Sequence, residues 1–132
     1  MELDVENAGT WFPWHDSRVC LRVCPASKLR EFKKAAGAKP VSEIVFEPKS
    51  RQAQKIVSEK IGDEDMFSRL LWDYVIVGWE GFTAKGVEFP CTAENKNLAI
   101  NNDAKFASFV TKHLRDLGEI EEAEEAAASK NL

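Results

Sequence analysis

The side chains best suited to chemistry are two histidines, His15 and His113, and three cysteines, Cys20, Cys24 and Cys91. Thiols and imidazoles are zinc ligands, but structural zinc sites favour pairs of cysteines separated by two residues. Cys20 and Cys24 are separated by three, and two further ligands would have to come from distant positions. The spacing therefore predicts no metal site. We interpret Cys20 and Cys24 as small, partly buried thiols on one face of a strand.

Neither histidine has the neighbours that a catalytic base needs. His15 lies in a turn-forming run, and His113 lies on the apolar stripe of the last predicted helix, where packing explains it. Gly78, Gly81 and Gly86 do not form a phosphate-binding loop, because no Lys-Ser or Lys-Thr pair follows them. We predict no catalytic residues, no cofactor and no enzymatic activity.

Aromatic residues are more informative, since five of them lie between residues 72 and 89. Such a cluster is typical of a core, although Trp and Tyr are also enriched in binding hot spots. Trp79 and Phe82 flank Gly81 at the entrance of a predicted loop, so we expect their side chains to be exposed. The aromatic residues predicted to bind a partner are Trp72, Trp79, Phe82 and Phe89.

The first third of the chain predicts short strands and one helix. Residues 11–24 have the alternation and the central turn of a β-hairpin. Ser27 is a plausible N-cap for a helix that ends at Gly37. Residues 41–46 alternate between two prolines, which favours a third strand over an extended link.

Two helices are predicted next. Residues 50–61 carry apolar side chains at helical spacing, and Gly62 would end that helix. Asp63 then offers an N-cap for the strongest amphipathic segment, whose end at residues 75–79 is continuously apolar and predicted to be buried on all sides. The apolar positions are Ala53, Ile56, Val57 and Ile61 in the first helix, and Met66, Phe67, Leu70, Leu71, Tyr74 and Val75 in the second.

Residues 80–91 contain two glycines and a proline, and predict a connecting loop with one short extended stretch at residues 87–89. Thr92 can cap the next short helix, in which Leu98 and Ile100 are expected to face inward.

Asn102 or Asp103 can cap the last predicted helix. Its core-facing side chains are Phe106, Phe109, Val110, His113, Leu114 and Leu117. After Gly118 the chain is rich in Ala and Glu with almost no apolar face, so we predict a tail that is disordered or marginally helical and orders on a partner. Glu121 and Glu122 are further predicted partner-binding residues.

Composition limits the class of partner. The chain has 132 residues, 44% of them hydrophobic and 30% charged, as expected for one folded core. The net charge is −4, and residues 116–132 hold six acids and one base; six minus one gives −5 there, leaving residues 1–115 near +1. This body lacks the basic stripe of nucleic-acid-binding proteins. Without an apolar run near the ~20 residues that cross a bilayer, or a secretory pattern, we expect a cytoplasmic protein without a membrane partner.

A family pattern lies in residues 72–100, which read WDYVIVGWEGFTAKGVEFPCTAENKNLAI. A predicted helix ends in a Trp-Glu-Gly turn at residues 79–81, a glycine introduces a short segment with proline at residues 86–90, and a Thr-x-Glu-Asn step at residues 92–95 begins a short helix. This pattern resembles the tail assembly chaperones of long-tailed bacteriophages. The N-terminal part is similar too, with Trp11, a turn and a Val-Cys-Leu-Arg-Val strand, so the likeness spans residues 10–117.

The resemblance implies a non-enzymatic role. Proteins of this family bind the tape measure protein in the host cytoplasm while the tail tube assembles, keep it soluble, and are absent from the finished virion. The tail tube protein and further copies of the chain are additional expected partners. The family often makes a second, longer product by ribosomal frameshifting, and the Ala-rich acidic end of this chain would fit the short product.

Together these observations predict an α+β, mainly helical single domain with an N-terminal β-hairpin and a mobile acidic C-terminal tail. Residues 1–117 form the globular domain and residues 118–132 the tail. The alternative function is that of a structural minor tail or head-to-tail connector protein that stays in the particle and self-assembles into a ring. A small regulator that shares the turn pattern is a third reading, and a DNA-binding regulator is disfavoured by the neutral body charge.

Overall fold

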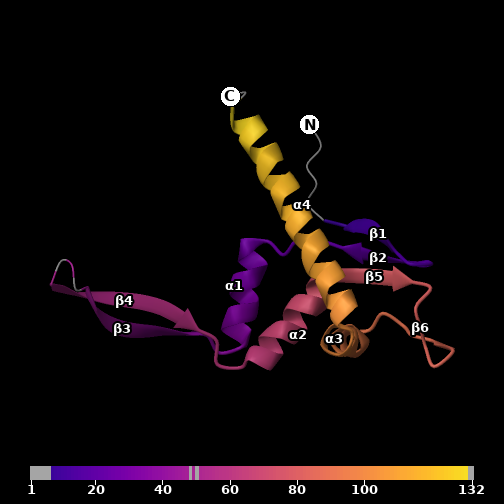
Figure 1. Ribbon diagram of the computed structural model, residues 1–132, viewed down its shortest axis with the longest axis horizontal. Helices are drawn as coiled ribbons and strands as arrows, with labels where there is room; N and C mark the ends of the chain where they lie inside the picture. Colours follow the sequence, from indigo (N-terminus) through magenta and orange to yellow (C-terminus); the bar gives the residue numbers. More distant parts are fainter. Residues whose placement is uncertain (1–6, 48, 50, 131–132) are drawn as a thin grey trace. The chain divides into compact units, whose positions relative to one another are not determined.

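The computed structural model describes residues 7–47, 49 and 51–130, with the side chains of residues 47, 54 and 119–130 outside this description. Strands and helices are interspersed along the chain, and two helices end it (Figure 1). In order they are β1 (Thr10–Trp14), β2 (Ser17–Leu21), α1 (Ala26–Ala35), β3 (Lys39–Glu47), β4 (Gln52–Lys60), α2 (Glu64–Val75), β5 (Ile76–Glu80), β6 (Thr83–Ala84), β7 (Val87–Glu88), α3 (Ala93–Asn102) and α4 (Ala104–Lys130).

The predicted α+β class is confirmed, but the prediction that the protein is mainly helical is wrong. The described strands form three small sheets, with the orders β1-β2-β5, β3-β4 and β6-β7. The chain divides into two compact units. Unit 1 comprises Met1–Cys24 and Leu71–Leu132, and unit 2 comprises Pro25–Leu70. The domain limits proposed from the sequence stay predictions.

Unit 1 is built on the sheet β1-β2-β5. The predicted N-terminal hairpin is confirmed, with Trp14 opposite Ser17 across a two-residue turn. β2 pairs with β5, so the apolar run that was expected to end a helix instead forms a strand from Ile76. Figure 1 shows α4 lying against this sheet. The buried core residues are Val19, Leu21, Val75, Ile76, Trp79, Phe106 and Val110.

Side-chain caps begin three of the helices, as predicted. The Asp63 carboxylate accepts the backbone N–H of Met66 (3.0 Å). The Thr92 hydroxyl oxygen accepts the N–H of Asn95 (3.2 Å). Each cap satisfies a backbone donor that the first turn of a helix leaves without an intrahelical partner. In α3, however, Leu98 is 45% exposed, so its predicted inward orientation is wrong.

Lys96 of α3 is a buried cation that the sequence did not single out. Its ammonium group donates to both the backbone carbonyl oxygen and the side-chain carboxylate of Asp73, each at 3.0 Å. Asp73 lies in the last turn of α2, where backbone carbonyls lack intrahelical donors and a positive charge is favourable. Lys96 therefore connects α3 to the end of α2.

Helix α4 continues to Lys130, where the sequence predicted a mobile tail. The segment after Gly118 is rich in Ala and Glu, which are strong helix formers. Extending an existing helix avoids the unfavourable nucleation step that a separate short helix would require. The acidic segment is thus a continuation of a core helix.

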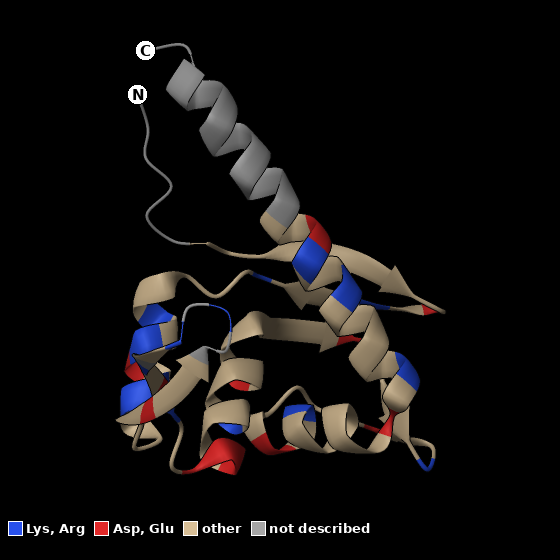
Figure 2. Ribbon diagram, turned by 60° about the vertical axis from the view of Figure 1, so that its left-hand side comes forward, with Lys and Arg blue, Asp and Glu red and all other residues tan. Residues whose placement is uncertain are grey.

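Unit 2 contains α1 and the β3–β4 ribbon. The predicted helix from residue 50 to 61 is wrong, because this segment is strand β4, paired in register with all of β3. Helix α1 begins after Pro25, without a side-chain cap, instead of at the predicted Ser27. Figure 2 shows that most of the charged positions along α1 are Lys or Arg. The N–H of Asp63 donates to the carbonyl oxygen of Ala36 (2.8 Å), joining the end of the ribbon to the end of α1.

Candidate functional site

Trp79 is the centre of the aromatic cluster. Its side chain is 8% exposed, so the prediction that it lies open at a loop entrance is wrong. The physical reason is that residue 79 belongs to β5 and lies opposite Val19 of β2, which places the indole in the core. The indole N–H donates to the carbonyl oxygen of Phe89 at 2.7 Å. This bond gives the buried ring the polar partner that it requires.

Phe82 and Phe89 stack on Trp79, with ring centroids 4.9 and 5.8 Å from the indole and interplanar angles of 11° and 10°. The N–H of Phe89 donates to the carbonyl oxygen of Phe82 (2.9 Å). Between these residues, β6 and β7 form a hairpin whose two turn residues, Lys85 and Gly86, have φ of 52° and 78°. Positive φ at both positions is required by a type I′ turn. The turn therefore holds the two phenyl rings at a fixed spacing.

A pocket of about 340 Å³ opens beside this cluster, and we call it the aromatic pocket. Its lining combines aromatic rings with polar side chains from β1, the β1–β2 turn, β6, α3 and α4. The buried Phe106 meets Phe82 edge to face, with centroids 5.7 Å apart. The lining residues are Trp14, His15, Asp16, Ser17, Gly81, Phe82, Thr83, Ala84, Phe89, Ala99, Asp103 and Phe106.

A second hollow, of about 480 Å³, adjoins the aromatic pocket. It is lined by residues 79–83 and 88–91. Phe82 and Phe89 line both spaces. These two rings are therefore reachable from two sides, although both are half-buried against the core.

Gly81 and Ser17 fix one edge of the aromatic pocket. The Ser17 hydroxyl donates to the carbonyl oxygen of Gly81 at 2.9 Å. Gly81 has φ of +82°, and a Cβ at this position would lie 3.1 Å from the Ser17 hydroxyl oxygen. Glycine is the residue that adopts this conformation without strain. The hydrogen bond and the glycine together hold the β1–β2 turn against the start of the β6–β7 arm.

An exposed ion pair lies next to this edge. The Arg18 guanidinium donates two hydrogen bonds to the Glu80 carboxylate, at 2.7 and 2.9 Å, and its carbon lies 4.2 Å from the centroid of the Trp11 ring. The hydrogen bond from Arg18 lowers the pKa of Glu80. Because both groups are exposed, solvent screens their attraction, and the pair contributes little to stability.

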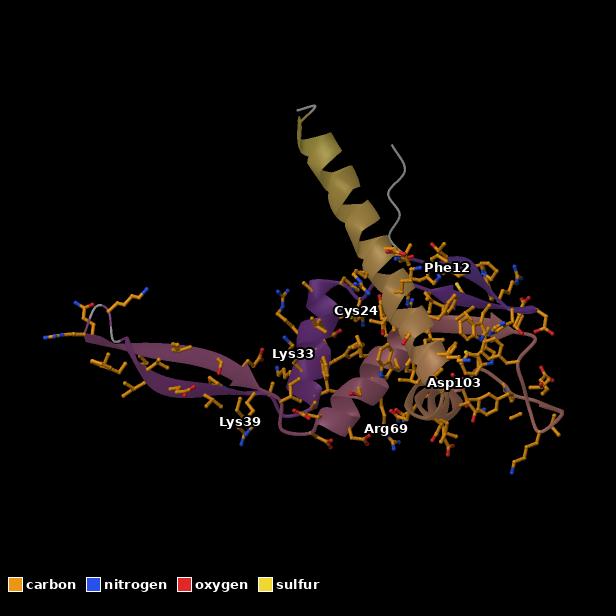
Figure 3. All side chains as sticks on the ribbon, viewed as in Figure 1. Phe12, Cys24, Lys33, Lys39, Arg69 and Asp103 are labelled. Carbon is orange, nitrogen blue, oxygen red and sulfur yellow. The ribbon has the colours of Figure 1, made fainter. Side chains whose placement is uncertain are left out.

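Asp103 positions the other side of the aromatic pocket. One carboxylate oxygen accepts the N–H groups of Lys105 and Phe106, both at 3.1 Å. Of the two caps proposed for the last helix, Asp103 is therefore the one observed. Figure 3 shows Asp103 at the junction of α3 and α4. This cap sets where α4 begins, and so where Phe106 enters the core.

Cys20, Cys91 and His113 are buried or half-buried in unit 1. Burial raises the pKa of the Cys20 and Cys91 thiols, which keeps them protonated, whereas a reactive cysteine needs a lowered pKa. His113 stacks on Phe12 with ring centroids 4.2 Å apart and meets Phe109 edge to face. Within the described part of the chain, groups of three or more His, Cys, Asp or Glu residues placed to hold a metal ion are absent. The aromatic pocket offers aromatic side chains for apolar contact beside the carboxylates of Asp16 and Asp103.

Three of the predicted partner-binding residues, all aromatic, come together at the two hollows. The fourth aromatic, Trp72, is half-buried against the core of unit 1. Glu121 and Glu122 belong to α4, but their side chains lie outside the described residues. The sequence missed Trp14 and Phe106 as lining residues, because only the packing of α4 on the β1–β2 hairpin brings them together.

Among the described residues, no helix has both the length and the apolar character needed to span a membrane. Comparison with protein-family models, curated proteins and solved structures finds no match to the chain.

Proposed function

We propose that the protein is a non-enzymatic phage tail assembly chaperone that binds the tape measure protein in the host cytoplasm and is absent from the mature virion. The observation that carries this proposal is the aromatic pocket with its two half-buried phenyl rings, Phe82 and Phe89. Its volume of about 340 Å³ lies within the range of ligand-binding pockets.

An amphipathic client helix suits this site. Such a helix presents apolar side chains at intervals of three and four residues, and it binds by placing them in an apolar hollow. Two adjoining hollows that share Phe82 and Phe89 can receive side chains from successive turns of one helix. A long tape measure helix exposes such a stripe before the tail is built, and covering it prevents aggregation.

Charge at the aromatic pocket favours a client with basic flanking residues. Asp16 and Asp103 line the aromatic pocket, and Glu88 lines the adjoining hollow. Lys and Arg beside the apolar stripe of a client would face these carboxylates. Complementary charge of this kind selects the partner and speeds association more than it raises affinity.

The experiment is co-expression with the tape measure protein of the same genome, followed by pull-down and measurement of soluble client. We expect Ala84→Arg to reduce capture by about tenfold or more, because it places a charged side chain in the aromatic pocket. The matched control is Ala93→Arg, at another exposed alanine that lies outside the lining. Full client capture by Ala84→Arg would show that the pocket is not the client site.

A structural role is the second candidate, and the apolar β3–β4 ribbon favours it. A minor tail or head-to-tail connector protein that forms a ring needs a surface for its own copies, and the ribbon exposes apolar side chains. Mass spectrometry of purified virions separates the two functions. The chaperone should be missing from the particle, whereas a structural component should be present in stoichiometric amount.

A further inference from the structure

The β3–β4 ribbon exposes apolar side chains on both of its faces. Residues that lie opposite each other in an antiparallel pair share a face. Ile44, Phe46 and Val57 lie on one face and are 76%, 61% and 62% exposed, whereas Val41, Val45 and Ile56 lie on the other. Figure 3 shows side chains standing on both sides of the two strands.

A ribbon of this kind is poorly stabilised by itself. Two strands without a third strand or a packed face are marginal in water. Nine residue pairs connect β3 and β4, so two long edges remain that can accept a further strand. Large exposed apolar side chains beside such edges mark a surface that another chain covers.

The two edges are not equally suited to a partner. β3 contains Pro40, which has no backbone N–H and is tolerated at a sheet edge but not in a central strand. β4 runs from Gln52 to Lys60 without a proline. A further strand is therefore expected along β4, which leaves β3 at the outside.

The charges of β4 fit a second copy of the same strand. In an antiparallel pairing with Val57 opposite Val57 of the other copy, Lys55 of each copy lies opposite Glu59 of the other. Opposite charges at directly facing positions stabilise a pair of strands. The Val57 side chains meet at the two-fold axis, and Ile44 and Phe46 of both copies lie on the same face of the sheet.

We propose that a second copy of this chain pairs with the first along β4, in antiparallel orientation about Val57, to form the four-stranded sheet β3-β4-β4-β3. The pairing does not depend on the proposed function. It joins two two-stranded ribbons into one sheet, and it places Lys55 of each copy opposite Glu59 of the other.

The test is the mass of the full-length protein in solution, measured by sedimentation over a range of concentrations. Wild type is expected to be a dimer. Lys55→Glu places two glutamates opposite each other at both ends of the pairing, and Glu59→Lys does the same with two lysines. Each variant is expected to weaken the dimer by about tenfold or more. Glu59 also lies 3.8 Å from Lys33, but this contact is long and the Glu59 side chain is 55% exposed, so the ion pair contributes little.

Two further samples make the test specific. An equal mixture of the Lys55→Glu and Glu59→Lys proteins restores opposite charges at both ends, so it is expected to form a heterodimer. Glu43→Lys reverses a charge on β3, outside the pairing, and should remain dimeric. A monomeric wild type would overturn the proposal, and so would a Lys55→Glu protein that dimerises as well as wild type. Loss of tape measure capture by Lys55→Glu with a monomeric wild type would assign the ribbon to the client instead.

Discussion

At the scale of single residues, Trp79 shows how the same side chain can suggest a surface or a core. Its neighbours Gly81 and Phe82 are typical of the entrance to a loop, so the sequence predicted that the Trp79 side chain is exposed. Its indole N–H has a partner in the carbonyl oxygen of Phe89, however, and its ring stacks with those of Phe82 and Phe89. Trp79 thus packs against Phe82 and Phe89, and these two phenyl rings line the aromatic pocket.

Truncating Trp79 should therefore act on stability. We expect Trp79→Ala to lower the free energy of unfolding by roughly 3–5 kcal/mol, because it removes a large buried ring and leaves a cavity. The measurement is urea unfolding followed by circular dichroism. A variant of near wild-type stability that has lost client binding would contradict this and return Trp79 to the contact surface.

Trp11 provides the matched control. Its ring is 42% exposed and contacts the Arg18 guanidinium, so Trp11→Ala should lower the free energy of unfolding by about 1 kcal/mol or less. The contrast between the two tryptophans tests burial, because the same atoms are removed in both.

At the scale of secondary-structure elements, the features that depend on neighbouring residues were predicted well. The N-terminal hairpin and the caps Asp63, Thr92 and Asp103 depend on neighbouring residues, and all are observed. The helix predicted over residues 50–61 was wrong because Ile56 and Val57 fit the apolar stripe of a helix and a strand equally well. The segment is a strand because it pairs with β3, and the spacing of apolar residues carries no information about that pairing.

The candidate site was predictable to a similar extent. Phe82 and Phe89 were identified because they lie close together in the sequence. The opposite wall of the aromatic pocket could not be identified, since Trp14 and Phe106 are far apart along the chain. The predicted end of α2 was wrong for a related reason. Ile76 begins a strand because it pairs with β2, and the apolar run after Val75 gives no indication of that pairing.

A cap gives a prediction at this scale. Asp103→Ala removes the acceptor for the N–H groups of Lys105 and Phe106, so it should lower the free energy of unfolding by about 1 kcal/mol. Asp103→Asn keeps an acceptor oxygen and should retain most of the stability. Thermal unfolding of both variants makes the measurement. Equal losses would indicate that the charge of Asp103, and not its hydrogen bonds, stabilises α4.

At the scale of the whole molecule, the two units differ in how much they bury. Unit 1 has a core of seven buried apolar residues drawn from β2, α2, β5 and α4. Among the described residues of unit 2, Ala36 is the buried one. Regions with few buried apolar contacts open locally at low cost in free energy. The β3–β4 ribbon is therefore the part of the molecule whose stability should depend most on a partner.

Hydrogen exchange can measure this difference directly. In the Lys55→Glu protein, we expect amides of β3 and β4 to exchange much faster than those of β2 and β5, because the ribbon lacks a core and its second copy. In wild type above its dimerisation concentration, β4 amides should slow by about tenfold or more, as their edge becomes hydrogen-bonded. Dilution should remove this protection from β4 and leave β5 unchanged. Protection of β4 that is independent of concentration would mean that the ribbon is stable without a second copy, and that its apolar faces are not held by self-pairing.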